Sequence, residues 1–361
     1  MISFALTEDQ EIARATAADF ARSVLRPAAR AADETAALPA PLVSTVWALG
    51  FVQAIAGAEL GSLEQPTVLN ALLLEELARG DAAAAVAIAA PLGFAKAVAE
   101  QGSERERREL LPLFAGDEPR LAAIAHVDSG WFEDAARPTK AAWVEGGCRL
   151  TGAKALMPLA AECSHILVTA ATDSGTGAFI VPVASDGVRI RPANGTLGLR
   201  ALAMADVVLD GAFVPEAARL GEDAGADVQR IVDLSRVALS AIMCGLSRAV
   251  FDVALPYAKE RVVHGEAIAK KQSVAFRLAD MHIEIEAMRW MVLRAAVEID
   301  HAKNATRSAR LAQLYAAEAA MRIADEGVQI FGGHGFVRDL PLEMWYRNAR
   351  SLSVLDGLVG A

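Results

Sequence analysis

Apolar and polar residues follow a helical pattern at both ends of the chain. Near the N-terminus, Thr7 and Gln10 predict a capping box, and residues 69–79 form a strong helical segment that Gly80 is expected to end as a C-cap. After residue 226, the clearest segment has apolar residues three and four positions apart. These residues are Leu278, Met281, Ile285, Met288, Val292, Ala295 and Ile299. Their spacing predicts a helix that packs along its length against other helices.

The middle of the chain has a different pattern. Short apolar and β-branched runs, separated by glycine, aspartate and serine, predict strands. The predicted strands are residues 149–151 (with a turn at Gly152), 165–169, 178–183 and 188–191. We therefore expect three domains. They are an N-terminal helical domain at residues 1–120, a small β-domain at residues 121–225 and a C-terminal helical bundle at residues 226–361.

Composition and charge exclude several classes of protein. With 54% hydrophobic and 22% charged residues, the chain can bury a large core, and disorder is not expected. The net charge of −10 argues against nucleic-acid binding, which requires a basic surface. Cys148, Cys163 and Cys244 are far apart and lack metal-ligand spacing, so we expect reduced, buried thiols and no metal site. No signal-peptide pattern or long uncharged apolar run predicts secretion or a membrane span, so we expect a cytoplasmic protein.

The candidate chemical motifs are ambiguous when each is taken alone. No GxGxxG after a strand, Walker A or GxSxG motif is present, and no nucleophile accompanies His126 and Asp128, so a hydrolytic triad is not predicted. Residues 329–333 are read either as a helix end or as a backbone that glycine lets approach a ligand. Arg261 is either a solvated helix-end cation or a partner for phosphate, and His264 is most simply a polar group at that helix end.

Together, these segments resemble the acyl-CoA dehydrogenase family. The matching stretches are FALTEDQ at residues 4–10, EELARGDA at 75–82, GSE at 102–104 with LP at 111–112, LTGAK at 150–154, ERVVHG at 260–265 with Gln272, and QIFGG at 329–333. The resemblance covers nearly the whole chain. It implies an acyl-CoA dehydrogenase-like fold, with an N-terminal α-helical domain, a middle β-barrel or sandwich and a C-terminal four-helix bundle.

The resemblance also implies FAD-dependent α,β-desaturation of an acyl-CoA thioester, in which a carboxylate takes the α-proton and the flavin accepts the β-hydride. The usual base is a glutamate in a YEGT-like stretch, and the matching residue here is Asp356. Its side chain is shorter by about 1.5 Å, one C–C bond. A second family position for the base is Ser235 here, with Asp233 two residues away. Arg236 is expected either to contact substrate or to pair with Asp233, and we favour the pairing.

In this family, each FAD is held by two subunits. One subunit holds the flavin ring through a TEP…GSD segment and a Trp-Ile-Thr stretch. This chain has a different sequence at residues 125–133, and Leu156, Met157 and Pro158 replace the Trp-Ile-Thr stretch. The neighbouring subunit holds the pyrophosphate and adenosine. The residues expected to do this here are Arg261, His264, Gln272, Gln329, Gly332 and Gly333.

This asymmetry leads to three hypotheses. The first is a subunit of an α2β2 hetero-oligomer whose homologous partner carries the flavin cradle and the working glutamate. Steroid-degrading bacterial members of the family use that arrangement, so a role in lipid or steroid catabolism and a bulky acyl-CoA are expected. The second is a self-sufficient homotetramer with Asp356 as the base. The third is a flavin-free binding or assembly subunit, or one with non-redox chemistry.

Overall fold

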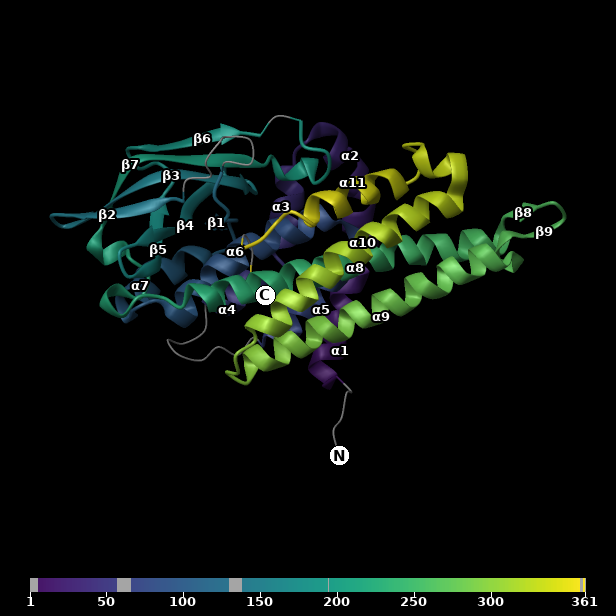
Figure 1. Ribbon diagram of the computed structural model, residues 1–361, viewed down its shortest axis with the longest axis horizontal. Coiled ribbons are helices and arrows are strands. Elements are labelled where there is room, and N and C mark those ends of the chain that lie inside the picture. The colour runs from purple at the N-terminus through teal and green to yellow at the C-terminus, as the bar shows by residue number, and fades with distance from the viewer. Residues whose placement is uncertain (1–5, 57–65, 130–137, 194, 358–359, 361) are drawn as a thin grey trace.

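The structure is a computed structural model that describes residues 6–56, 66–129, 138–193, 195–357 and 360. Helical regions precede and follow the strands of a β-sheet in the chain, and the sheet lies at one end of the molecule beside the helices (Figure 1), which confirms the predicted fold class. Parts of three segments used in the sequence comparison lie outside the described residues. These parts are residues 4–5 of the N-terminal stretch, residues 130–133 of the stretch expected to hold the flavin, and Leu358.

The N-terminal region is built of helices. They are α1 (Glu8–Phe20), the π-helix η1 (Ala21–Leu25), α2 (Arg26–Thr35), α3 (Ala40–Trp47), α4 (Phe51–Ala56), α5 (Thr67–Gly80), α6 (Ala82–Gln101), α7 (Glu104–Leu110) and the 3₁₀ helix η2 (Leu111–Phe114). The predicted capping box is confirmed, because Thr7 accepts from the Gln10 N–H and the Gln10 side chain accepts from the Thr7 N–H. These bonds satisfy N–H groups that the first turn leaves without a helical partner.

The predicted C-cap role of Gly80 is wrong. Gly80 is the last residue of α5, and the cap residue after it, Asp81, is extended and caps the start of α6 through its side chain. A Cβ on Gly80 would lie 2.5 Å from the Ala21 carbonyl oxygen. Glycine is therefore required at this position because η1 packs against α5, and not because a left-handed turn ends the helix.

The middle region is a sheet with the described strand order β1-β4-β2-β3-β7-β6, and β5 pairs with β4. The strands are β1 (Leu121–Ala125), β2 (Lys140–Val144), β3 (Gly147–Met157), β4 (Cys163–Thr172), β5 (Gly175–Pro182), β6 (Val188–Pro192) and β7 (Ala205–Pro215). Three short 3₁₀ helices accompany them. These are η3 (Arg200–Leu202), η4 (Glu216–Ala218) and η5 (Glu222–Ala224). Three of the four predicted strands correspond to β4, β5 and β6.

The remaining predicted strand, residues 149–151, is part of a longer strand, β3. The predicted turn at Gly152 is wrong, because β3 continues through it to Met157. A Cβ on Gly152 would lie 2.6 Å from the Cα of Thr139, so the glycine permits a close approach of two chain segments. The three cysteines are buried and free, as predicted, and burial raises the pKa of Cys148 to about 11 and that of Cys163 to about 12.

Long helices form the C-terminal region. They are α8 (Val228–Glu260), α9 (Gln272–Asp300), α10 (Thr306–Phe331) and α11 (Leu342–Leu352). A short hairpin of β8 (Val262–Val263) and β9 (Glu266–Ala267) and the 3₁₀ helix η6 (Ile268–Lys270) connect α8 to α9, and η7 (Gly332–Phe336) follows α10. All seven residues of the predicted apolar seam on α9 are buried, which confirms the predicted packing. The helix contacts α5, α8 and α10.

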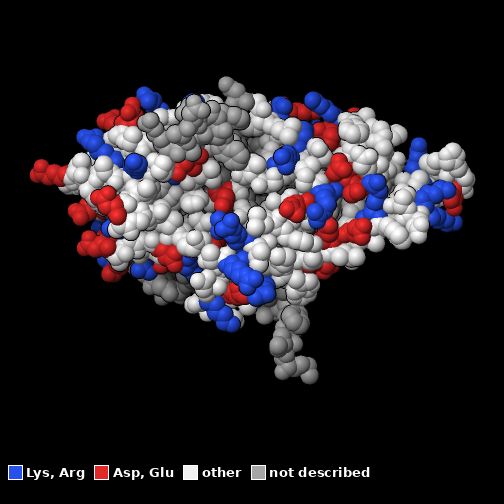
Figure 2. Space-filling model, viewed as in Figure 1, with Lys and Arg blue, Asp and Glu red and all other residues white. Residues whose placement is uncertain are grey.

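A second apolar row on α9 faces outward. Phe276, Ile283, Trp290 and Val297 are spaced seven residues apart and are 61%, 63%, 48% and 42% exposed. A helix that is apolar on both its buried and its exposed side is typical of a helix that contacts another chain. On the face shown in Figure 2, basic and acidic side chains are intermixed, with no large area of one sign.

Two helices are long and apolar enough to cross a membrane by length and composition alone. They are α6 and α8, and 94% and 78% of their most apolar windows are buried inside the protein. Core helices of folded proteins have these same properties, so the two helices are weak support for a membrane span.

Candidate functional site

Asp356 lies just after α11, where the chain returns to the sheet. Its two carboxylate oxygens accept hydrogen bonds from Nε and Nη2 of Arg236 on α8, at 3.1 and 2.9 Å. Arg236 also lies 3.8 Å from Asp233, so the expected pairing of these two residues is present but is the longer one. The bidentate contact with Asp356 is the geometry that a planar guanidinium makes best.

Asp356 is therefore held in place, with its side chain 31% exposed. The alternative base position is occupied by Ser235, which is fully buried. Asp233 is engaged elsewhere, because it accepts hydrogen bonds from Thr306 at 2.7 Å and from Gln229 at 2.8 Å. Among the described carboxylates that were considered as bases, Asp356 is the one that remains partly open to solvent, and Arg236 restrains it.

His126 is a site residue that the sequence interpretation set aside. It follows β1, and its Nδ1 lies 3.1 Å from the Thr169 hydroxyl. Gly357, which has φ of +64°, packs directly against it, because a Cβ at Gly357 would lie 2.5 Å from the His126 Cβ. Burial and then the positive charge of Lys154 lower the pKa of His126, although Asp356 opposes the shift. The clue in the sequence was its position within residues 125–133, the segment expected to hold the flavin ring.

Lys154 joins this segment to the sheet. Its side chain is 2% exposed, and its ammonium group donates to Asp128 at 2.7 Å and to the His126 carbonyl at 2.9 Å. Thr139 also donates to Asp128, through both its N–H and its hydroxyl. Burial alone would raise the pKa of Asp128, but the hydrogen bonds from Lys154 and Thr139 outweigh it and lower that pKa. The LTGAK stretch therefore does not form the predicted turn. Its lysine, Lys154, is a buried cation that pairs with Asp128.

The end of β3 (residues 154–157) and the segment after β1 (residues 126–129), together called the sheet edge, do not fit a flavin ring well. β3 itself lies inside the sheet, between β2 and β7. The backbone groups of the sheet edge are already paired, since Ala155 N–H donates to the Val127 carbonyl and Ser129 N–H to the Ala153 carbonyl. Leu156 has φ of +56°, and its N–H donates to Asp206 at 3.3 Å. Pro158 has no N–H to offer. Few polar groups therefore remain on the described part of this edge to bind the ring.

The residues predicted to bind the nucleotide tail lie at the other end of the C-terminal helices. Arg261 caps the end of α8, and its N–H donates to the Tyr257 carbonyl at 2.8 Å. Tyr257 stacks on Phe331 of α10, with ring centroids 3.9 Å apart. Because of this stack, the end of α8 lies beside Phe331 at the end of α10, and Gly332 and Gly333 follow directly.

These predicted residues all face outward. Arg261, His264, Gln272, Gln329, Gly332 and Gly333 are exposed. His264 and Gly265 form the turn of the β8–β9 hairpin, with φ of +53° and +84°, so His264 lies in a hairpin turn that follows the helix end. Gly332 has φ of +59° and ends α10, as the motif predicted. No atom would contact a Cβ on Gly333, so no described neighbour within the chain requires glycine there.

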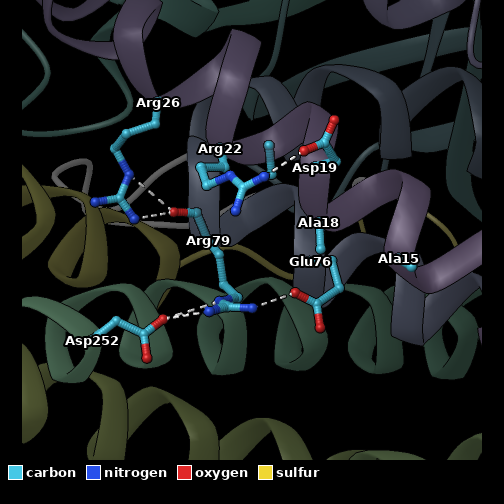
Figure 3. A pocket seen from close by; sticks show the side chains of 9 residues that line it. Ala15, Ala18, Asp19, Arg22, Arg26, Glu76, Arg79 and Asp252 are labelled. Carbon is cyan, nitrogen blue, oxygen red and sulfur yellow. Dashed lines mark hydrogen bonds and ion pairs between the residues drawn. The ribbon is translucent and has the colours of Figure 1, made fainter.

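A separate pocket of about 590 Å³ lies between α1, η1, α5 and α8. In Figure 3, Arg79 lies between Glu76 and Asp252, and Arg22 pairs with Asp19. Arg26 donates to the Arg79 carbonyl and stacks on Trp345. Each carboxylate on the pocket wall is paired with an arginine, and none of the predicted site residues lines the pocket.

Comparison with known proteins covers both helical regions. The family described as "Acyl-CoA dehydrogenase, N-terminal domain" matches residues 7–118, and "Acyl-CoA dehydrogenase, C-terminal domain" matches residues 225–358. The mitochondrial short-chain specific acyl-CoA dehydrogenase of Bos taurus is 30% identical over 98% of this chain and 88% of its own length. A probable acyl-CoA dehydrogenase of Bacillus subtilis is 29% identical over 99% of this chain and 96% of its own length.

Solved structures give the same result for the whole chain. The structure of butyryl-CoA dehydrogenase from Megasphaera elsdenii superposes with a TM-score of 0.88 and 27% sequence identity, covering 98% of this chain and 95% of that one. The superposition covers 98% of this chain and so includes the sheet, which shows that the middle region shares the fold of the comparison structure.

Proposed function

The chain belongs to the acyl-CoA dehydrogenase family, and from this premise we propose that it acts on acyl-CoA thioesters within a hetero-oligomer. In this proposal, a homologous subunit supplies the flavin cradle and the working glutamate. The present chain supplies the residues that hold the pyrophosphate and adenosine of the partner's FAD. The proposed assembly is an α2β2 tetramer, in which two copies of each subunit are related by closed symmetry.

The observation that carries the proposal is the difference between the two predicted halves of the FAD site. The sheet edge has its polar groups paired within the chain, around Leu156 and Lys154. The ends of α8 and α10 have their polar groups exposed: Arg261 ends α8, and the glycines that follow α10 have open space around them. A guanidinium binds phosphate well, and glycine lets a backbone approach a ligand closely.

The outward apolar row of α9 supports an oligomer. Phe276 and Ile283 are more than half exposed, and Trp290 and Val297 continue the row at the same seven-residue spacing. Exposed large apolar residues in a continuous row are costly in water and are typical of a protein interface. A contact along α9 buries this row in another chain.

In the proposed assembly, FAD supplies the hydride acceptor for desaturation. Arg261 binds negative charge at its phosphates, and the QIFGG backbone lies against the nucleotide. Asp356 stays paired with Arg236 and holds the C-terminal segment against the sheet. The proton acceptor is then a carboxylate of the partner, which must lie within hydrogen-bond reach of the reacting carbon.

The test is to purify the chain alone and after co-expression with a homologous subunit. We expect a colourless protein alone, and a yellow complex with fewer FAD molecules than chains. Arg261→Gln should weaken FAD retention by the complex by about tenfold, the usual effect of losing one charge-assisted hydrogen bond. Arg294→Gln is the matched control, because Arg294 is 76% exposed and pairs with Glu298 on the surface. An FAD-loaded chain that is active alone contradicts the proposal.

The self-sufficient homotetramer is the second candidate, and one observation favours it. The Asp356 carboxylate is retained at the family's usual base position and is partly exposed. In that case, Asp356→Asn should abolish dehydrogenation by the purified chain. The two candidates therefore differ in whether the chain alone binds FAD and in whether Asp356 is needed.

A further inference from the structure

A buried lysine lies on α6, away from the residues discussed so far. Lys96 is 2% exposed, and its ammonium group donates one hydrogen bond, to the Thr67 hydroxyl at 3.0 Å. Among the described residues it forms no salt bridge. Burial lowers the pKa of Lys96 to about 8, although Glu100 and Asp300 oppose the shift. Among the described residues, two of its three N–H donors thus have no partner.

A buried amide with no partner lies one helical turn from Thr67. Asn70 is 1% exposed, and neither its Oδ1 nor its Nδ2 makes a hydrogen bond within the part of the chain that the structure describes. Residues three apart on a helix are neighbours on its surface, so Asn70 lies near the Thr67–Lys96 contact. A buried polar group without a partner is costly, and two in one place indicate that a polar group from outside the chain completes the cluster.

The charges around the cluster indicate what that group is. Arg230 pairs with Glu100 at 2.6 Å, and Asp300 accepts from the N–H groups of Thr67 and Val68. The two cations, Lys96 and Arg230, are therefore matched by two carboxylates. A neutral oxygen satisfies the open donors without adding charge, whereas a carboxylate would add an unbalanced one. The cluster thus fits a hydroxyl or carbonyl oxygen, or a water molecule.

The cluster is close to the end of the chain that carries Asp356. Gly360 donates from its N–H to the Ala89 carbonyl at 2.9 Å, and a Cβ at Gly360 would lie 2.3 Å from the Gly93 Cα, three residues from Lys96. On α8, Arg236 holds Asp356 and Arg230 holds Glu100. These two arginines are six residues apart, which is about 9 Å along a helix that rises ~1.5 Å per residue.

We propose that Lys96, Thr67 and Asn70 form a polar subsite that binds a hydroxyl or carbonyl oxygen on the far part of the acyl group. In the free protein, water occupies it. This inference rests on the proposed action on acyl-CoA thioesters and names their class, which is oxygenated acyl groups rather than plain hydrocarbon chains. The subsite discriminates between them because a plain chain leaves the buried donors without partners.

The test measures binding rather than turnover, using the co-expressed complex and isothermal titration calorimetry. The probes are ω-hydroxyacyl-CoA thioesters and plain acyl-CoA thioesters of equal length, from about six to about twelve carbons, so that the terminal hydroxyl is tested at several distances from the thioester. We expect the hydroxylated thioester of the best length to bind about tenfold more tightly, which is the worth of one buried hydrogen bond.

The variants are Lys96→Met and Asn70→Leu, each an apolar replacement of similar size. Each should reduce the preference for the hydroxylated thioester to about twofold or less, since the removed group supplied its hydrogen bond. Circular dichroism checks folding, and the two variants test the subsite independently. Lys303→Met is the control, because Lys303 is exposed near the same end of α9 and should keep the full preference.

Equal affinity for the two probe classes at every length overturns the inference, and so does a preference that persists in both variants. Absence of binding by every thioester overturns it as well. The proposed hetero-oligomer fails by a different measurement, the FAD content of the chain with and without its partner. If the complex has the expected flavin content but shows no preference for oxygenated probes, the proposed subsite is contradicted and the proposed hetero-oligomer is not.

Discussion

The edge of the sheet near β3 and the ends of α8 and α10 use their polar groups in opposite ways. At the sheet edge, Lys154, Asp128 and Thr139 are bonded to one another, and the neighbouring backbone groups are paired. At the helix ends, Arg261 and the residues from Gln329 to Gly333 are exposed. A segment whose hydrogen bonds are satisfied internally gains little by binding a ligand, whereas an exposed cation beside open backbone can still gain partners.

The largest expected effect concerns the glycine that seats Asp356 against the sheet. Gly357→Ala should lower the free energy of unfolding by about 3 kcal/mol, because a left-handed φ costs about 1–2 kcal/mol and overpacking adds about as much. Gly146→Ala is the control, since Gly146 also has a positive φ but has open space around it, and it should cost about 1 kcal/mol. Urea unfolding measures both. Equal losses would show that the contact with His126 is not tight.

The next effect tests the internal bonding of the sheet edge. Asp128→Asn leaves Lys154 buried without a counter-charge and should cost about 2 kcal/mol, whereas Asp210→Asn removes an exposed pair and should cost about 0.5 kcal/mol or less.

The pH dependence follows from the sign of the shift. The folded-state pKa of Asp128 is lowered, so its contribution is present above the unfolded-state pKa of about 4 and is lost as pH falls through the folded-state value. The difference in unfolding free energy between the wild type and Asp128→Asn should therefore shrink below about pH 4. A constant difference across that range contradicts the assignment.

A smaller effect tests the open region. Gly333→Ala should leave the stability of the isolated chain unchanged, because a Cβ there meets nothing within the chain. In the co-expressed complex it should weaken FAD retention by about tenfold, if a nucleotide approaches this backbone closely. Gly116→Ala, also in open space, should change neither quantity. Flavin absorbance after dialysis measures retention, and full retention by Gly333→Ala would show that nothing approaches Gly333.

The helices and their packing were predictable because they depend on local spacing. The α9 seam and the Thr7 capping box follow from residues a few positions apart. The roles of Gly80 and Gly152 were not predictable. Each is fixed by a distant segment, η1 in one case and Thr139 in the other, and the sequence near each glycine suggested a cap or a turn. A local pattern reports conformation, whereas a close approach depends on tertiary structure.

The candidate site divides in the same way. The position of Asp356 after the last helix follows from its motif, but its bidentate contact with Arg236 joins residues 120 positions apart. His126 was set aside because no nucleophile accompanies it in sequence, and its contact with Gly357 exists only in the fold. Contacts between the sheet and the C-terminal segment could not be inferred from spacing, so the sequence predicted the residue types of this site better than their partners.

The smallest expected effect separates the two candidate functions. In the co-expressed complex, Asp356→Asn should change turnover by about twofold or less, because the working base belongs to the partner and the amide still accepts one hydrogen bond from Arg236. Steady-state turnover with an artificial electron acceptor measures it. The FAD content of the complex is the control, since a variant that loses flavin reports misassembly rather than a missing base. If turnover falls by about 100-fold or more while flavin is retained, Asp356 is itself the proton acceptor, and its pairing with Arg236 must open when substrate binds.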